Sequence, residues 1–124
     1  MYLDNNSSDD AGTTKSRRLG VGGKLARALL ALGEGQGRIV LHEEKPWASI
    51  TFAGARHRFV MEFSGEEAVE AGECFIVFLP DHEFAIPGQL VADAAITAVE
   101  HTVEHRVEPP VLKVTCELLL LEEG

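Results

Sequence analysis

The sequence contains few of the features that small proteins use in place of a large hydrophobic core. It has two cysteines in 124 residues, too few for a disulfide framework or a structural zinc site with four cysteine ligands. No apolar run approaches the roughly 20 residues that a membrane-spanning helix needs. With 45% hydrophobic and 25% charged residues, the composition is that of one ordinary globular domain. We therefore predict a chain that folds without a metal or cofactor and does not span a membrane.

Basic side chains are scarce after residue 36. Residues 37–124 carry six Lys or Arg against sixteen Asp or Glu, and the whole chain has a net charge of -9. Such an acidic surface repels phosphate backbones, so we expect no nucleic-acid binding by the folded part. A basic stretch near the N-terminus is a candidate contact for a protein partner. Its members are Lys15, Arg17, Arg18, Lys24 and Arg27.

The N-terminal segment has almost no apolar content. Residues 1–19 are rich in Asn, Ser, Asp, Gly and Thr, which predicts a disordered tail. Residues 20–124 are then expected to form a single α+β domain. The two arginines in the tail precede an apolar stretch that Lys24 and Arg27 interrupt, which argues against an export signal. We therefore expect a cytoplasmic protein with reduced thiols.

The middle of the chain alternates between helical and strand-like patterns. Leucines and alanines at helical spacing predict a short helix over residues 24–32, which ends at Gly33. Three strand-like runs then follow with turn residues between them, and the short connections require antiparallel neighbours. These runs are Arg38–His42, Trp47–Phe52 and Arg56–Phe63, with predicted turns at residues 43–46 and 53–55.

A second short helix and two fully apolar runs are predicted further along. Ser64 and Glu67 have the spacing of a capping box, so we expect a two-turn helix over residues 65–71 that Gly72 closes. Cys74–Leu79 and Leu118–Leu121 are apolar on both sides, which is typical of strands covered on both faces.

Residues 90–107 fit either a helix or a strand. Apolar residues recur at helical spacing, but Val and His also alternate with Glu, Thr and Arg over residues 97–108. The alternation favours a strand, paired in a long hairpin with Val111–Glu122. The expected fold is thus α+β, with an antiparallel β-meander sheet of five or six strands and two short helices. Helices this short cover one face of the sheet, so we expect a homodimer to cover the other, with a closed barrel as the alternative.

Two groups of residues are candidate sites. His101 and His105 flank Glu104 in an H-x-x-E-H pattern, which binds zinc when helical. In a strand the two histidines lie about 13 Å apart, so we expect no shared metal there. Asp81, His82 and Glu83 follow an apolar run and lie between two prolines, where a carboxylate beside an imidazole can bind a ligand.

No motif in the sequence defines an activity. We expect a non-enzymatic binding or assembly module, with a ligand-binding site at Asp81, His82 and Glu83. The alternative is a small metal-assisted hydrolase that uses His, Asp or Glu from residues 81–83 or 101–105. Whether the protein is an enzyme is left open.

Overall fold

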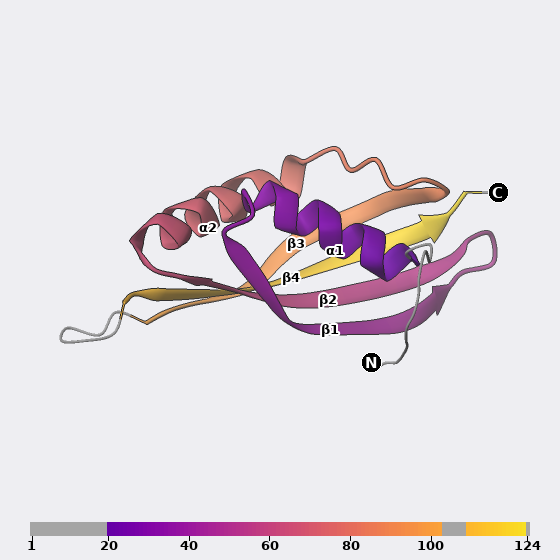
Figure 1. Cartoon of the computed structure of the whole chain (residues 1–124). Coiled ribbons are helices and arrows are strands. Elements are labelled where there is room, and N and C mark those ends of the chain that lie inside the picture. The colour runs from indigo at the N-terminus through magenta and orange to yellow at the C-terminus, as the bar shows by residue number, and fades with distance from the viewer. Residues whose placement is uncertain (1–19, 103–108, 124) are drawn as a thin grey trace, which may run out of the picture.

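The computed structural model describes residues 20–102 and 109–123. Within them the helices are α1 (Val21–Leu32), α2 (Glu66–Phe78) and the short 3-10 helix η1 (Leu79–Asp81), and the strands are β1 (Gly37–Ala48), β2 (Ala53–Ser64), β3 (Gln89–Thr102) and β4 (Val111–Glu122) (Figure 1). The four strands form one antiparallel sheet in the order β1-β2-β4-β3. In the described ranges, neither α-helix is long and apolar enough to cross a membrane. The predicted tail at residues 1–19 lies outside this part of the chain.

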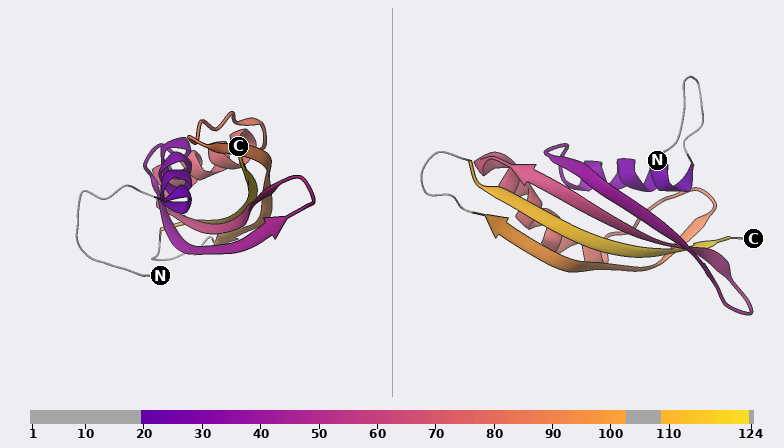
Figure 2. Two further views of the ribbon diagram at one scale, coloured as in Figure 1. Left: turned by 90° about the vertical axis from the view of Figure 1, so that its right-hand side faces the viewer. Right: turned by 90° about the horizontal axis from the view of Figure 1, so that it is seen from below.

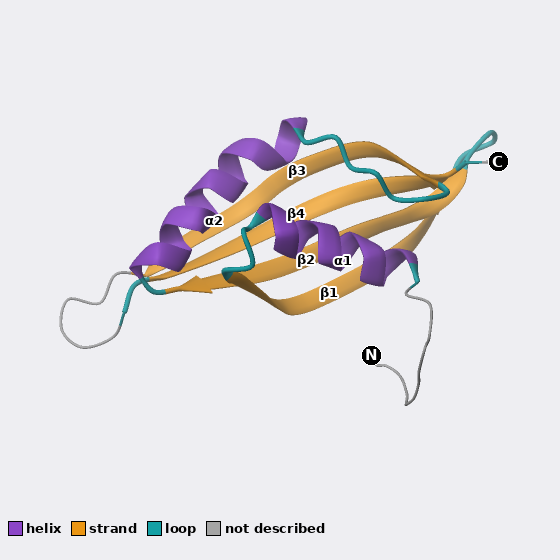
Figure 3. Ribbon diagram, turned by 45° about the horizontal axis from the view of Figure 1, so that its top comes forward, coloured by secondary structure: helices purple, strands orange, loops and turns teal. Residues whose placement is uncertain are grey.

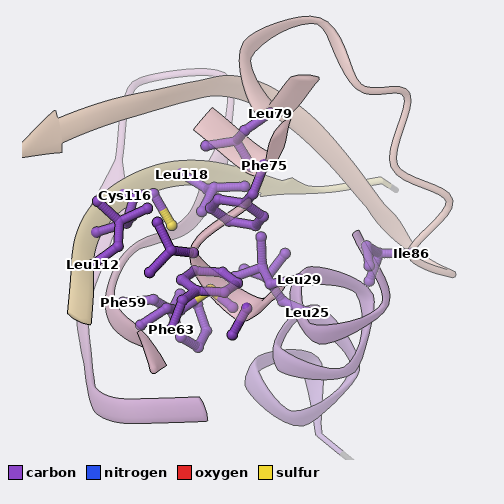
Figure 4. Packing of buried hydrophobic residues seen from close by; sticks show 14 of the residues in the cluster. Leu25, Leu29, Phe59, Phe63, Phe75, Leu79, Ile86, Leu112, Cys116 and Leu118 are labelled. Carbon is purple, nitrogen blue, oxygen red and sulfur yellow. The ribbon is translucent and has the colours of Figure 1, made fainter. Parts of the chain in front are cut away.

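The molecule has two layers. Both α-helices lie on the same face of the sheet, and the sheet curves around them (Figures 2 and 3). Between the layers lies a core of buried side chains from both helices and from β2 and β4 (Figure 4). Its largest fully buried members are Phe59, Phe63, Phe75, Leu25 and Leu29. The α+β class and the antiparallel sheet are confirmed, and both helices cover one face, as expected.

The strands β2 and β4 occupy the middle of the sheet, and each alternates more and less buried residues over much of its length. On β2, Phe59, Met61 and Phe63 are fully buried beneath the helices, whereas Arg58 and Glu62 point to the opposite face. The alternation predicted for this run is confirmed. The strand β4 has the bounds that the sequence predicted for the second arm of the long hairpin.

In the described part of the chain the sheet has four strands rather than the predicted five or six. One reason is that Arg38–His42 and the first two residues of Trp47–Phe52 belong to one strand, because β1 continues through the predicted turn at residues 43–46. Charged residues and a proline suggested that turn, but β1 is an edge strand, where exposed charges and Pro46 are tolerated. The actual turn lies at Ser49–Phe52, where the Ser49 amide donates to the Phe52 carbonyl at 2.7 Å.

The second reason is that Cys74–Leu79 is helical, not a strand. It forms the end of α2 and the start of η1. A short apolar run is compatible with either structure, and here the burial repeats at helical spacing, with Ala71, Phe75 and Leu79 all buried. The predicted capping box is also wrong, because Gly65 is the N-cap and no side chain caps the helix. Gly72 lies inside α2 rather than at its end.

The ambiguous segment is a strand wherever the structure describes it. The strand β3 covers residues 89–102 and pairs with β4 along its whole length, which confirms the predicted hairpin. The remaining residues of that segment, 103–107, lie outside the described residues.

We predict that Gly72→Ala destabilises the protein although alanine is the better helix former. A Cβ atom at position 72 would lie 2.8 Å from both Phe63 and Leu112, so α2 could no longer pack as closely on the sheet. Overpacking of about 1–3 kcal/mol outweighs a helix-propensity gain of about 1 kcal/mol. Chemical denaturation should show a net loss on the order of 1 kcal/mol. The exposed neighbour Glu73→Ala is the control, and a stabilised Gly72→Ala variant would show that this contact is not tight.

Candidate functional site

The residues of the predicted ligand site lie together in one exposed loop. Asp81 ends η1, and His82 and Glu83 follow it on the way to β3. All three side chains are exposed, and the His82 ring packs edge-on against Phe84 with 4.6 Å between ring centroids. Ligand binding at Asp81, His82 and Glu83 stays a prediction.

The H-x-x-E-H segment is only partly described. His101 is an exposed residue of β3, opposite Leu112 of β4. Glu104 and His105 lie outside the described residues. His101 has the extended backbone that the strand interpretation predicted. In a strand, two histidines four residues apart are too distant to share a metal.

A cluster that the sequence analysis missed lies on the helix-covered face of β1 and β2. It consists of His42, Glu44 and His57, and their nearest ligand atoms all lie within 4.8 Å of one another. Alternation places His42 and Glu44 on one face of β1, and the sheet register sets Glu44 directly opposite His57. The two imidazoles are in contact, with His42 Nε2 2.9 Å from His57 Nδ1.

A β-bulge in β1 determines which residues join this cluster. Ile39 pairs with Met61, but Leu41 pairs with Val60, so Val40 is the extra residue. Bulges shift the alternation of the residues that follow and often re-aim side chains at functional sites. Without this one, His42 would point to the opposite face of the sheet.

The His57 ring is buried and incompletely hydrogen-bonded. Its exposed fraction is 0%, and its Nε2 atom has no hydrogen-bond partner among the described residues. Burial lowers the pKa of His57, while the charge of Glu44 acts in the opposite direction and His42 lowers the pKa further. Burial also lowers the pKa of His42. Burial therefore favours the neutral form of both imidazoles, and the hydrogen bond between them uses the N–H of one ring and the lone pair of the other.

The first turn of α1 and a phenylalanine hold the His42 ring in place. Phe59 stacks on it with 4.1 Å between ring centroids and 6° between the planes. From the helix, Gly22 approaches so closely that a Cβ atom there would lie 2.7 Å from His42 Cε1. A side chain at position 22 would therefore push the ring aside, so α1 sets the geometry of the cluster.

A cavity of about 170 Å³ adjoins the cluster. His57 and Glu44 form part of its wall, and Gln89 and Glu122, at the adjoining ends of β3 and β4, contribute two further polar side chains. The remainder of the wall is Val21, Pro46, Gly54 and Ala55. The cavity gives a small ligand or water molecules access to the two cluster residues.

The opposite face of the sheet, which we call the outer face, carries a second candidate site. At its centre is an open depression of about 460 Å³ that all four strands line. A row of small or apolar residues crosses the sheet there. In register, the row is Leu41, Val60, Thr115 and Ala98.

Charged residues of alternating sign flank this apolar row on both sides. The row on one side is Arg38, Glu62, Lys113 and Glu100, and the row on the other side is Glu43, Arg58, Glu117 and Ala95. Two ion pairs link β1 to β2 within these rows: Arg38 to Glu62 at 2.6 Å and Arg58 to Glu43 at 2.7 Å. From β1 through β2 to β4, the charges are positive, negative and positive in the first row. In the second row they are negative, positive and negative.

No protein-family model, curated protein or solved structure matches this chain significantly. The function is therefore argued from the geometry and chemistry of the two sites.

We predict that His57 makes the protein less stable in mild acid. Because its pKa is lowered in the folded state, the unfolded chain binds a proton more readily below about pH 6.5. The free energy of unfolding therefore keeps its full value above that pH and decreases as the pH falls below it. The melting temperature of the wild type should drop more than that of His57→Phe between about pH 7 and about pH 5. His82→Ala is the control and should follow the wild type, whereas parallel curves for wild type and His57→Phe would contradict a buried neutral ring.

Proposed function

We propose that the protein is a non-enzymatic assembly module whose outer face binds a second copy of the chain, forming a homodimer. The observation that supports this is the charge pattern of the outer face, because it is complementary to itself under a two-fold rotation. Closed two-fold dimers use the same surface on both subunits, so self-complementarity is the property that such an interface needs.

In one arrangement of the dimer, the two-fold axis lies between the two outer faces and runs parallel to the strands, over the boundary between β2 and β4. It stacks β2 of one copy on β4 of the other, which sets Glu62 opposite Lys113 and Arg58 opposite Glu117. In the same arrangement Val60 faces Thr115, so the two apolar rows meet at the centre.

A second axis, along the apolar row and perpendicular to the strands, also pairs opposite charges. It stacks each strand on its own counterpart and exchanges the two charged rows. Arg58 then faces Glu62, and Glu117 faces Lys113, while the residues of the apolar row meet their own copies. Both axes give sheet-on-sheet packing of the kind seen in β-sandwiches.

The whole outer face approaches the area of a standard protein interface. Four strands at about 4.8 Å spacing and 12 residues at about 3.3 Å per residue give a surface on the order of 700 Å². Standard interfaces bury about 800 Å² on each partner. Since the sheet curves around the helices, contact centres on β2 and β4, where the charged rows have their regular alternation (Figure 2).

The remaining expectations stay proposals. A cytoplasmic location accords with the free state of Cys74 and Cys116. The basic stretch near the N-terminus stays a candidate contact for a protein partner, with Lys24 and Arg27 on α1 as its described members. The metal-assisted hydrolase that uses residues 81–83 or 101–105 also stays a prediction.

We predict that Lys113→Glu weakens the dimer on the order of tenfold or more, because position 113 faces an acid under either axis. Light scattering at micromolar concentration should give twice the chain mass for the wild type and a lower mass for the variant. Thr115→Arg, which places an unpaired charge in the apolar row, should act in the same direction. Circular dichroism establishes that each variant is folded.

The control for charge is Glu70→Lys on the exposed side of α2, which should leave the mass unchanged. A wild type of 13.5 kDa throughout the micromolar range would overturn the proposal. So would a dimer whose affinity neither outer-face variant changes.

Cysteine crosslinking distinguishes the two axes. With Cys74→Ser as the background, Thr115→Cys should crosslink to itself under the perpendicular axis and to Val60→Cys of a second chain under the parallel axis. Cys116 does not interfere, because burial raises the pKa of its thiol to about 12. Crosslinks in neither combination would contradict sheet-on-sheet packing.

A further inference from the structure

The geometry points to a binding site for a divalent first-row transition metal ion at His42, Glu44 and His57, with open coordination positions toward the adjoining cavity. This site lies on the opposite face of the sheet from the proposed dimer interface and does not rest on it. Two imidazoles and one carboxylate form a ligand set that binds zinc, copper, nickel or iron.

The donor atoms are close enough to bind one ion together. His42 Nε2 and His57 Nδ1 are 2.9 Å apart, and the third ligand atom lies within 4.8 Å of both. Two nitrogens at about 2.1 Å from a metal and 2.9 Å from each other subtend about 90°, the angle between neighbouring ligands in octahedral and tetragonal sites. A tetrahedral zinc ion needs about 3.4 Å between the nitrogens, which a small opening of the pair provides.

The hydrogen bond between the rings must open for the ion to enter. It aims the two nitrogens at each other, so His42, the more exposed ring, has to rotate until both lone pairs meet at the metal. The proton held between the rings moves to the other nitrogen of its own ring.

The buried ring supports a binding role over a packing role. His57 is inaccessible to solvent, yet its Nε2 atom lacks a partner among the described residues. An unpaired buried polar atom destabilises a fold, and a phenylalanine would fill the same position without that cost. A histidine at this buried position is therefore costly for packing alone, and its Nδ1 atom, which faces His42, is the nitrogen available to a metal ion.

The surrounding charges favour a cation. Glu44 supplies one negative charge at the site, and Glu122 lines the same cavity. Among the described residues, the lining of the cavity contains no Lys or Arg that would repel a metal ion. The open positions of the bound ion would face this cavity, where water or a small anionic ligand can occupy them.

The test is metal titration of the full chain after treatment with a chelator. Calorimetry with Zn²⁺ and with Cu²⁺ should show one site per chain with micromolar or tighter affinity. His42→Ala and Glu44→Gln should each weaken it roughly tenfold or more, since each removes one ligand. The Cu²⁺ electron paramagnetic resonance spectrum should show coupling to two nitrogens in the wild type and to one in His42→Ala.

Matched controls separate this site from adventitious binding. Glu43→Gln, the neighbour of Glu44 on the outer face, and His82→Ala, an exposed histidine, should both retain wild-type affinity. His42 is exposed, so we expect His42→Ala to fold even if His57→Ala does not. Equal affinity in wild type, His42→Ala and Glu44→Gln would mean adventitious binding and would overturn the proposal, as would no binding at all.

The tests of the metal site and of the dimer have independent outcomes. The monomeric variant Lys113→Glu should bind the metal like the wild type, and His42→Ala should leave the dimer intact. Loss of metal binding in Lys113→Glu would contradict the assignment of the ligands to β1 and β2 of a single chain.

Discussion

The burial of one side of β2 beneath the two helices governs the arrangement of the whole molecule. Phe59, Met61 and Phe63 point inward with no exposed surface, so they fix which side of the central sheet the helices cover. The neighbouring strand β4 follows the same division through its register with β2. Because the side-chain period of a strand is two, the outward row of β2 is determined at the same time. The core and the outer face are thus two consequences of one alternation.

The same inward-facing row of β2 ends in a polar residue, which belongs to the candidate metal site. His57 continues the row of Phe59, Met61 and Phe63 toward the end of the sheet where α1 begins. An unsatisfied buried nitrogen costs about 1–3 kcal/mol, a sizeable part of the stability of a chain this small. The neighbouring carboxylate of Glu44 and the adjacent cavity make that position suitable for a ligand rather than for further core packing.

The parts of the fold that follow from local pattern could be predicted from the sequence. Arg56–Phe63 was predictable because it alternates with a period of two, and β4 was predictable because residues 111–118 alternate in the same way before the apolar run Leu118–Leu121. Cys74–Leu79 was not, because an apolar run of six residues has no period, and its helical state is imposed by packing of α2 on the sheet. The metal-ligand cluster joins two strands, with twelve residues between Glu44 and His57. No sequence motif spans them, and only the register brings them together.

The β-bulge at Val40 connects both sites and explains why neither could be derived from periodicity in β1. An unbroken alternation continued from Ile39 would place Leu41 in the core and His42 on the outer face. The extra residue reverses this order, so His42 and Glu44 face the helices while Leu41 and Glu43 face outward. One inserted position therefore supplies two ligands to the inner cluster and completes the charge pattern of the outer face. Removing it would shift every later side chain of β1 to the other face, so the two sites depend on the same local departure from regular strand geometry.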